Sequence, residues 1–478
     1  MFKTRFHTSK PVLIAILAII STIGCSSQPT IDDPLTTLSQ TNERQIKYLT
    51  AMQMLDSQPD NEDYRKALKR MMSYPGYTVA VRMLAFNRLE LLDEAGLKLT
   101  IRRKFPRLQA PMWKEELLNL IVDRGWVDLT PAIVSAWGSH LGFVEDTERL
   151  EYLALVQLHG KENVVDVIFN VLLESNRPGQ QGLRGRCWDL LHRLGHRDRL
   201  VDLLADANIG EDDAMLIDLR AGATQLGLVP RNREEILWMR KLRQPQRAEF
   251  WSQAVVAVQG LPKARRIELE LRDLPIVVAA SIHDPWLLNA TKEDLYAKVR
   301  AHIRSTKVHI DTKRFTGLPG TYPQNLYEHR SKLTWGDLAA MVLAVRAVSV
   351  PEVVEHLFDY AQRDHEDDSC EYGGIIALDN KGRFEVLEFP PRIRHHDNEF
   401  IASQEMMDAG YTAVMHFHNH AQEYRNTRNA GPGLGDVNYA HNTRTNCLVF
   451  SFVNENTLNV DYYRHSRVIV DLGEIKRQ

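Results

Sequence analysis

Regularly spaced glycines between apolar helical segments constrain the fold of this chain more than any other feature. They recur at separations of 29, 35, 35 and 32 residues, at Gly96, Gly125, Gly160, Gly195 and Gly227. Each follows a segment whose apolar residues repeat at helical spacing, and glycine just past a helix end accepts the left-handed conformation that other residues resist. A second apolar segment often follows, as in "ENVVDVIFNVLLES". Helix pairs with a period of about 30 to 36 residues predict a stacked α-helical solenoid over residues 41–271.

This solenoid pattern resembles HEAT-like repeats, although no residue fixes the subtype. A helical array presents a long curved surface, so we expect it to bind a protein partner, with a packing scaffold as the alternative. Beyond it, residues 272–349 contain the glycine- and proline-rich stretch "FTGLPGTYPQN" and then a helical segment, Trp335–Ser349. We interpret them as a linker and connecting helix region.

Length and charge limit the class of protein. The chain has 478 residues, more than one hydrophobic core usually holds, so we expect a multidomain protein. It carries 59 basic and 62 acidic residues, a net charge of -3. Such a balance offers no general attraction for polyanions, and we expect no nucleic-acid partner.

The N-terminus predicts a secretory signal peptide over residues 1–24. Three basic residues precede the uncharged stretch "PVLIAILAIISTIG", which is too short to span a bilayer comfortably. Cys25 follows, and residues 25–40 begin with the polar "CSSQPTIDDP", which is typical of a tether. "TIGC" resembles the bacterial lipoprotein cleavage box, with Thr22 where leucine is usual. The resemblance implies that Cys25 is lipidated and anchors the chain to the membrane of a bacterial cell envelope. With Ser26 after it, the outer membrane is favoured in a two-membrane bacterium, and a soluble secreted or periplasmic protein is the alternative.

The sequence does not decide whether two of the other three cysteines form a disulfide. They are Cys187, Cys370 and Cys447. In an oxidising compartment Cys370 and Cys447 could pair, but two buried thiols agree with the sequence at least as well.

The last part of the chain, residues 350–478, reads as an α/β domain. A helix opened by Pro351 precedes short apolar segments typical of strands. These segments are "GGIIALD", "FEVLEFP", "TAVMHFH", "CLVFSFV", "TLNVDYY" and "RVIVDLG". With further helices over "NEFIASQEMMDAG" and after Asp436, the pattern predicts a mixed sheet flanked by helices.

The third of these strands carries three imidazoles on one face. Because side chains alternate along a strand, His416, His418 and His420 point the same way. Buried imidazoles need partners for their ring nitrogens, and a metal ion would provide one. A hydrolytic zinc site needs three protein ligands, an open position for water and a nearby carboxylate.

Two acidic residues complete such a set. Glu371 begins the first strand, and Asp436 stands where a glycine-rich loop enters a helix, a favourable place for a negative charge. The order of glutamate, His-x-His and aspartate resembles the JAMM (JAB/MPN-type) metalloprotease family over residues 350–478. The segments that carry the resemblance are "EHLFDYAQRDHEDDSCEYGGII", "VMHFH" and "PGLGD".

The resemblance implies a zinc-dependent peptidase or isopeptidase acting on a protein or peptide substrate. His416, His418 and Asp436 would bind Zn²⁺, and Glu371 would accept a proton from the attacking water. His418 with His420 is the alternative histidine pair, and we expect His416 with His418.

The sequence departs from the family at three places. Gly433 stands where the family has a serine that helps to hold the oxyanion, a role that a backbone N–H or Asn429 could take over. Asn419 occupies a position where proline is typical, or Ala421 does in the alternative register. The loop from His418 to Asp436 spans 18 residues, longer than usual. A catalytically inactive binding module or an envelope scaffold is therefore the alternative function.

Overall fold

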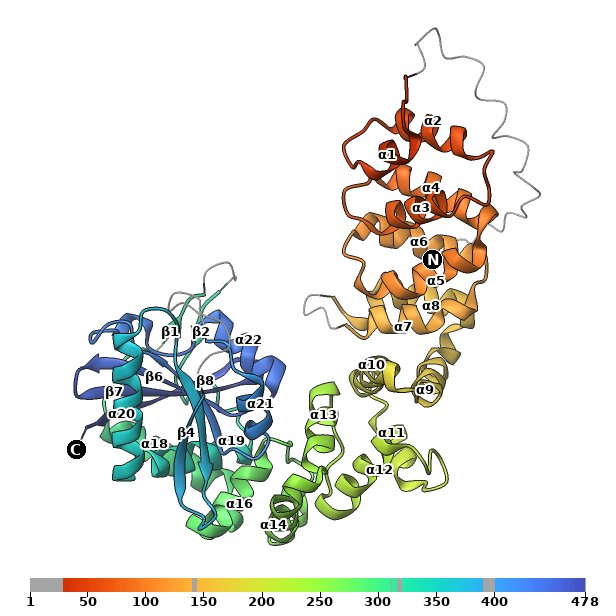
Figure 1. The fold of residues 1–478 in the computed structure, drawn as a ribbon. Helices are drawn as coiled ribbons and strands as arrows, with labels where there is room; N and C mark the ends of the chain where they lie inside the picture. The colour runs from red at the N-terminus through yellow and green to blue at the C-terminus, as the bar shows by residue number, and fades with distance from the viewer. Residues whose placement is uncertain (1–28, 140–143, 311, 316–319, 390–399, 478) are drawn as a thin grey trace, which may run out of the picture. The chain divides into compact units, whose positions relative to one another are not determined.

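A computed structural model describes most of the chain and divides it into two compact units (Figure 1). The described residues are 29–139, 144–310, 312–315, 320–389 and 400–477. One unit ends at Val167 and the other begins at Ile168, so the boundary falls inside the predicted helical-repeat region 41–271. The predicted signal peptide and Cys25 lie outside the described residues.

The first unit consists of helices that pack against their neighbours in the chain. They are α1 (Pro34–Ser39), α2 (Gln45–Leu55), α3 (Glu62–Ser73), α4 (Val79–Leu92), α5 (Glu94–Lys104), α6 (Pro111–Asp123), α7 (Thr130–Trp137) and α8 (Leu150–His159). Local sequence explains where such helices begin. At α3 the side-chain oxygen of Asn61 caps the helix by accepting hydrogen bonds from the backbone N–H groups of Asp63 and Tyr64, each at 3.0 Å. Helix α1 falls within residues 25–40, which we expected to be a tether.

Four of the five predicted helix-closing glycines have a positive φ, although Gly160 combines it with a ψ of 143° and so is not in the left-handed helical conformation. Gly125, Gly160, Gly195 and Gly227 have φ of 61°, 85°, 82° and 69°. At Gly96 the interpretation is wrong, because this residue lies in the first turn of α5. Its N–H donates to the carboxylate of Asp93 at 2.8 Å, and Asp93 caps the helix.

Helices also make up the second unit as far as residue 305. They are α9 (Val164–Glu174), which begins just before the boundary, α10 (Gln181–Arg193), α11 (Arg197–Ala205), α12 (Ala214–Ala221), α13 (Arg233–Leu242), α14 (Ala248–Gln259), α15 (Lys263–Arg266), α16 (Asp273–His283), α17 (Trp286–Asn289) and α18 (Lys292–Ser305). The expected order of a helical part followed by a mixed sheet with helices is confirmed.

All six predicted strands are present and form one six-stranded sheet in the order β4-β3-β5-β6-β7-β8. They are β3 (Gly373–Leu378), β4 (Phe384–Phe389), β5 (Met415–His420), β6 (Cys447–Asn454), β7 (Thr457–Arg464) and β8 (Val468–Lys476). Within this sheet β5 and β6 run parallel, and the other neighbouring pairs run antiparallel. Strand β5, which carries the histidines, is thus an interior strand.

Helices cover both faces of the sheet, as Figure 1 shows for α20 (Pro351–Glu366). On that face the ring of Phe417 meets the ring of Tyr360 of α20, with centroids 6.2 Å apart. The opposite face, toward which the histidines of β5 point, is covered by α21 (Gln404–Gly410) and α22 (Leu434–Thr443). Val437 of α22 packs there against Val449 of β6.

Residues 272–349, which we interpreted as a linker, belong to the second compact unit. Helix α19 (Trp335–Ala347) is almost wholly buried, and a short ladder pairs β1 (Thr312–Lys313) with β2 (Tyr322–Pro323). Arg272 and Asp337 form a buried ion pair at 2.9 Å. Asp337 also pairs with Arg464 of β7 at 2.8 Å. Charge and packing therefore bind this segment to the sheet, although its glycines and prolines resemble those of a loop.

Candidate metal centre

Strand β5 presents His416, His418 and His420 on one buried face of the sheet. The strand lies between β3 and β6, so backbone hydrogen bonds on both sides hold it in place. Phe400 stacks over the ring of His418, with centroids 5.8 Å apart. The three imidazoles are thus fixed by the fold before any ligand is considered.

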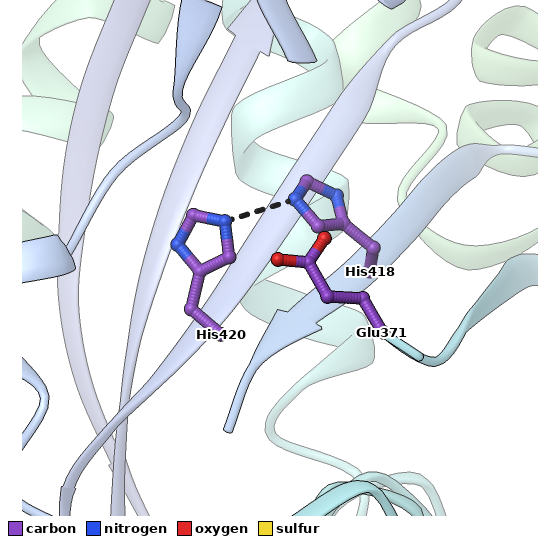
Figure 2. A group of neighbouring side chains, drawn as sticks. All are labelled: Glu371, His418 and His420. Carbon is purple, nitrogen blue, oxygen red and sulfur yellow. Dashed lines mark hydrogen bonds between the residues drawn. The ribbon is translucent and has the colours of Figure 1, made fainter. Parts of the chain in front are cut away.

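Two of these histidines converge with two carboxylates. Ligand atoms of Glu371, His418 and His420 all lie within 4.8 Å of one another (Figure 2). Asp436 approaches from α22, with Oδ1 3.3 Å from Nε2 of His418 and Oδ2 3.6 Å from Nε2 of His420. Two imidazole nitrogens and carboxylate oxygens therefore surround one buried point.

Backbone pairing explains why Glu371 joins this group. Gly373 of β3 lies opposite His418 of β5 in an antiparallel ladder. In such a ladder the residue two positions before Gly373 lies opposite the residue two positions after His418. Glu371 therefore lies opposite His420. The carboxylate is oriented by Gln422, whose Nε2 donates to Oε1 of Glu371 at 3.2 Å.

Neighbouring groups contact the Nδ1 atoms of both rings, on the side away from the carboxylates. Nδ1 of His420 lies 2.9 Å from the carbonyl oxygen of Asn429, which can only accept, so Nδ1 carries the proton. Nδ1 of His418 lies 3.4 Å from the hydroxyl of Tyr463. Such partners commonly orient metal-binding histidines and fix their tautomer. The Nε2 atoms of His418 and His420 face each other at 3.2 Å, as Figure 2 shows. The donor set therefore fits a divalent ion such as Zn²⁺.

Asp436 is negatively charged in this setting. Burial alone would raise the pKa of its carboxyl, but His418 and His420 hold that pKa well below its usual range. The backbone N–H of Gly433, which caps α22, donates to Oδ2 at 2.6 Å. The expected place of Asp436 at a helix start is confirmed.

His416 lies outside the converging group, although we expected it to be a ligand. Its Nδ1 lies 2.7 Å from the hydroxyl of Tyr439, and Gly410 packs directly against its Nε2 edge. Burial lowers the pKa of His416 to about 4, so the ring is neutral near pH 7. The physical reason is the position of the carboxylates, because Glu371 lies opposite His420 and Asp436 reaches only His418 and His420 among these rings. The structure thus brings together the alternative pair, His418 and His420.

A cavity of about 450 Å³ opens beside the site. Its lining includes Lys313, Glu371, His420, Asn426, Asn429 and Gly433. Sequence reasoning missed Lys313, since it lies in an irregular segment with no motif around it. The bonds from its Nζ to the carbonyl oxygens of Ala430 and Gly431 place it there.

The thiols in the described part of the chain play no part in this centre. Cys370 and Cys447 are buried thiols, so the disulfide that the sequence left open is not formed. Burial raises the pKa of the Cys447 thiol to about 12. A thiolate that could bind metal is therefore unfavourable there.

No protein-family model, curated protein or solved structure matches this chain. Among the described residues, every helix falls short of the length and apolar character that a membrane crossing requires. What the site does is therefore inferred from its geometry.

Proposed function

We propose that this protein is a zinc-dependent hydrolase that cleaves an amide bond in a peptide or protein. His418, His420 and Asp436 hold the metal, and Glu371 moves the proton. The observation that carries the proposal is the convergence of two imidazoles and Glu371 within 4.8 Å, with Asp436 in contact with both rings. When bound, Zn²⁺ supplies Lewis acidity that polarises a carbonyl and lowers the pKa of a water to about 7.

In this proposal Glu371 acts as general base and then as general acid. Its carboxylate accepts a proton as the oxygen of water bonds to the carbonyl carbon of the amide. The same proton passes to the amide nitrogen when the C–N bond breaks, so the products are a carboxylic acid and an amine. Gln422 supports this role, because its N–H donates to Oε1 and holds the carboxylate toward the cavity.

The resemblance to the JAMM family supports the peptidase chemistry, while Gly433 supports one alternative. A glycine offers no side-chain donor to the carbonyl oxygen, and losing one such donor can cost about 100-fold in rate. A metal-stabilised module that binds without cleaving is the second candidate function. The hydrolase requires the carboxylate of Glu371, whereas the binding module does not.

We further propose that the helical pairs form a HEAT-like solenoid that gathers the substrate or another protein partner. Lipidation of Cys25 would anchor the chain at the bacterial envelope, most simply at the outer membrane. The support for both lies in the sequence: the periodic helix pairs and the basic and apolar segment before Cys25. Labelling cells with a palmitate analogue tests the anchor, and Cys25→Ser should abolish the label.

Metal analysis of the purified protein beside His418→Ala tests the site. We expect about one zinc per wild-type chain and little in the variant. Zinc absent from both would end the proposal.

Glu371→Gln separates the two candidate functions. We expect it to keep its zinc and to lose cleavage of a peptide mixture followed by mass spectrometry. Glu455→Gln, at an exposed turn between β6 and β7, is the matched control and should cleave like the wild type. If the wild type contains zinc but the wild type, Glu371→Gln and Glu455→Gln do not differ in peptide cleavage, the binding module is favoured.

A further inference from the structure

A lysine from outside the region that resembles the JAMM family reaches the candidate site. Lys313 belongs to β1, which lies before residues 350–478. Its side chain lines the same cavity as Glu371, His420 and Gly433. The cavity therefore contains a cationic group besides the metal-binding residues.

Two hydrogen bonds fix the position of this ammonium group. Nζ of Lys313 donates to the carbonyl oxygens of Ala430, at 3.2 Å, and Gly431, at 2.9 Å. Gly431 has a φ of 74°, which favours glycine at this position in the loop. Since an ammonium has three N–H donors, one remains after these two bonds.

The loop that holds Lys313 also holds the metal-binding residues. The carbonyl oxygen of Asn429 is bonded to His420, and the N–H of Gly433 is bonded to Asp436. The lysine anchors lie between these two positions in the chain. The stretch of residues 429–433 therefore contacts Lys313, His420 and Asp436 alike.

A positive charge is not needed merely to satisfy two carbonyl groups. An uncharged amide side chain could donate to both without the cost of burying an ammonium. Burial lowers the pKa of Lys313, while Asp461 and Asp436 act in the opposite direction. These two carboxylates therefore favour the charged ammonium, and its remaining N–H is not used by the loop.

We propose that Lys313 donates its third N–H to the carbonyl oxygen of the scissile amide, and so replaces the hydroxyl that Gly433 lacks. This inference rests on the proposed hydrolysis. As the oxygen of water bonds to the carbonyl carbon, the C=O π-electron pair moves onto the carbonyl oxygen, and it returns when the C–N bond breaks. An ammonium beside that oxygen stabilises the negative charge while it exists.

Kinetics of zinc-loaded variants test the role. Lys313→Gln keeps N–H donors for the loop but removes the charge, and Lys313→Arg keeps the charge. We expect Lys313→Gln to lower kcat about 100-fold with KM changed little, and Lys313→Arg to recover part of the loss. Lys307→Gln is the control, because that lysine side chain is 68% exposed beside Glu474, and it should behave like the wild type.

A binding measurement judges Lys313 without relying on turnover. Acetate is titrated into the Co²⁺-substituted protein and followed by the visible spectrum of the metal. We expect acetate to bind Lys313→Gln about 10-fold more weakly than the wild type, as the loss of one charge-assisted hydrogen bond predicts. A wild type that binds acetate in this way but cleaves no peptide would refute the hydrolase and retain the anion-binding role of Lys313.

Two outcomes would overturn the inference. One is equal acetate affinity in Lys313→Gln and wild type together with equal kcat. The other is a loss of bound metal or a clearly lower Tm in both Lys313 variants, which would make the residue a structural support of the loop.

Discussion

Arg272→Met tests whether the segment before the sheet is locked into the second unit by buried charge. The Arg272 side chain is fully buried and connects three parts of the fold. Nε lies 2.6 Å from Glu270, Nη2 lies 2.9 Å from Asp337 of α19, and Nη1 donates to Asn446 beside β6 at 2.5 Å. Methionine has a similar length but leaves these oxygens without the guanidinium.

The size of the effect follows from the partners that remain. Removing one member of a buried ion pair commonly costs about 3 to 5 kcal/mol. Asp337 keeps Arg464, whose Nε and Nη2 donate to it at 2.9 and 2.8 Å, so we expect a loss near the lower end, about 3 kcal/mol. At 2 to 4 °C per kcal/mol, Tm should fall by roughly 6 to 12 °C.

Differential scanning calorimetry of the whole protein measures this shift. Arg383→Met is the control: its side chain is 72% exposed beside Asp379, so water screens the pair and Tm should hardly change. Burial alone would raise the pKa of Asp337, but Arg272 and Arg464 hold that pKa well below its usual range. The Asp337 ion pair therefore contributes to the free energy of unfolding above about pH 4, and this contribution is lost as pH falls toward the pKa of Asp337 in the folded protein. The Tm values of the variant and the wild type should converge in acid. Equal Tm values for Arg272→Met and wild type near pH 7 would refute the reasoning.

Three further predictions concern the centre and its surroundings. His420→Ala should lose zinc while His416→Ala keeps it, because only the first ring joins the converging group, and metal analysis showing the reverse would contradict the ligand assignment. Gly410→Ala should destabilise the protein by about 1 to 3 kcal/mol in urea unfolding, since an added Cβ would clash with Nε2 of His416, and an unchanged midpoint would show that the ring can move aside. Burial raises the pKa of the Cys187 and Cys447 thiols to about 12, so both should resist Ellman's reagent until denaturant is added, and rapid labelling in buffer would show that these regions open.

The local elements followed from local patterns in the sequence. Alternating and continuous apolar runs located all six strands of the sheet, and Pro351 marked the start of α20. Gly96 was misread because the pattern cannot tell a glycine after one helix from a glycine in the first turn of the next when Asp93 alone separates them.

Sequence by itself determined the six strands, many of the helices and the kinds of side chain that could hold a metal, since each depends on residues only a few positions apart. It did not predict the helices α16, α17 and α18, which lie where we interpreted a linker. Tertiary structure alone decided which of these elements and side chains meet. The register of β3 against β5 brought Glu371 to His420 and left His416 with Tyr439. Hydrogen bonds to Ala430 and Gly431 brought Lys313 to the same cavity. Strand register is a property of hydrogen bonding between distant segments, and a shift of two residues keeps every side chain on the same face while changing its neighbours.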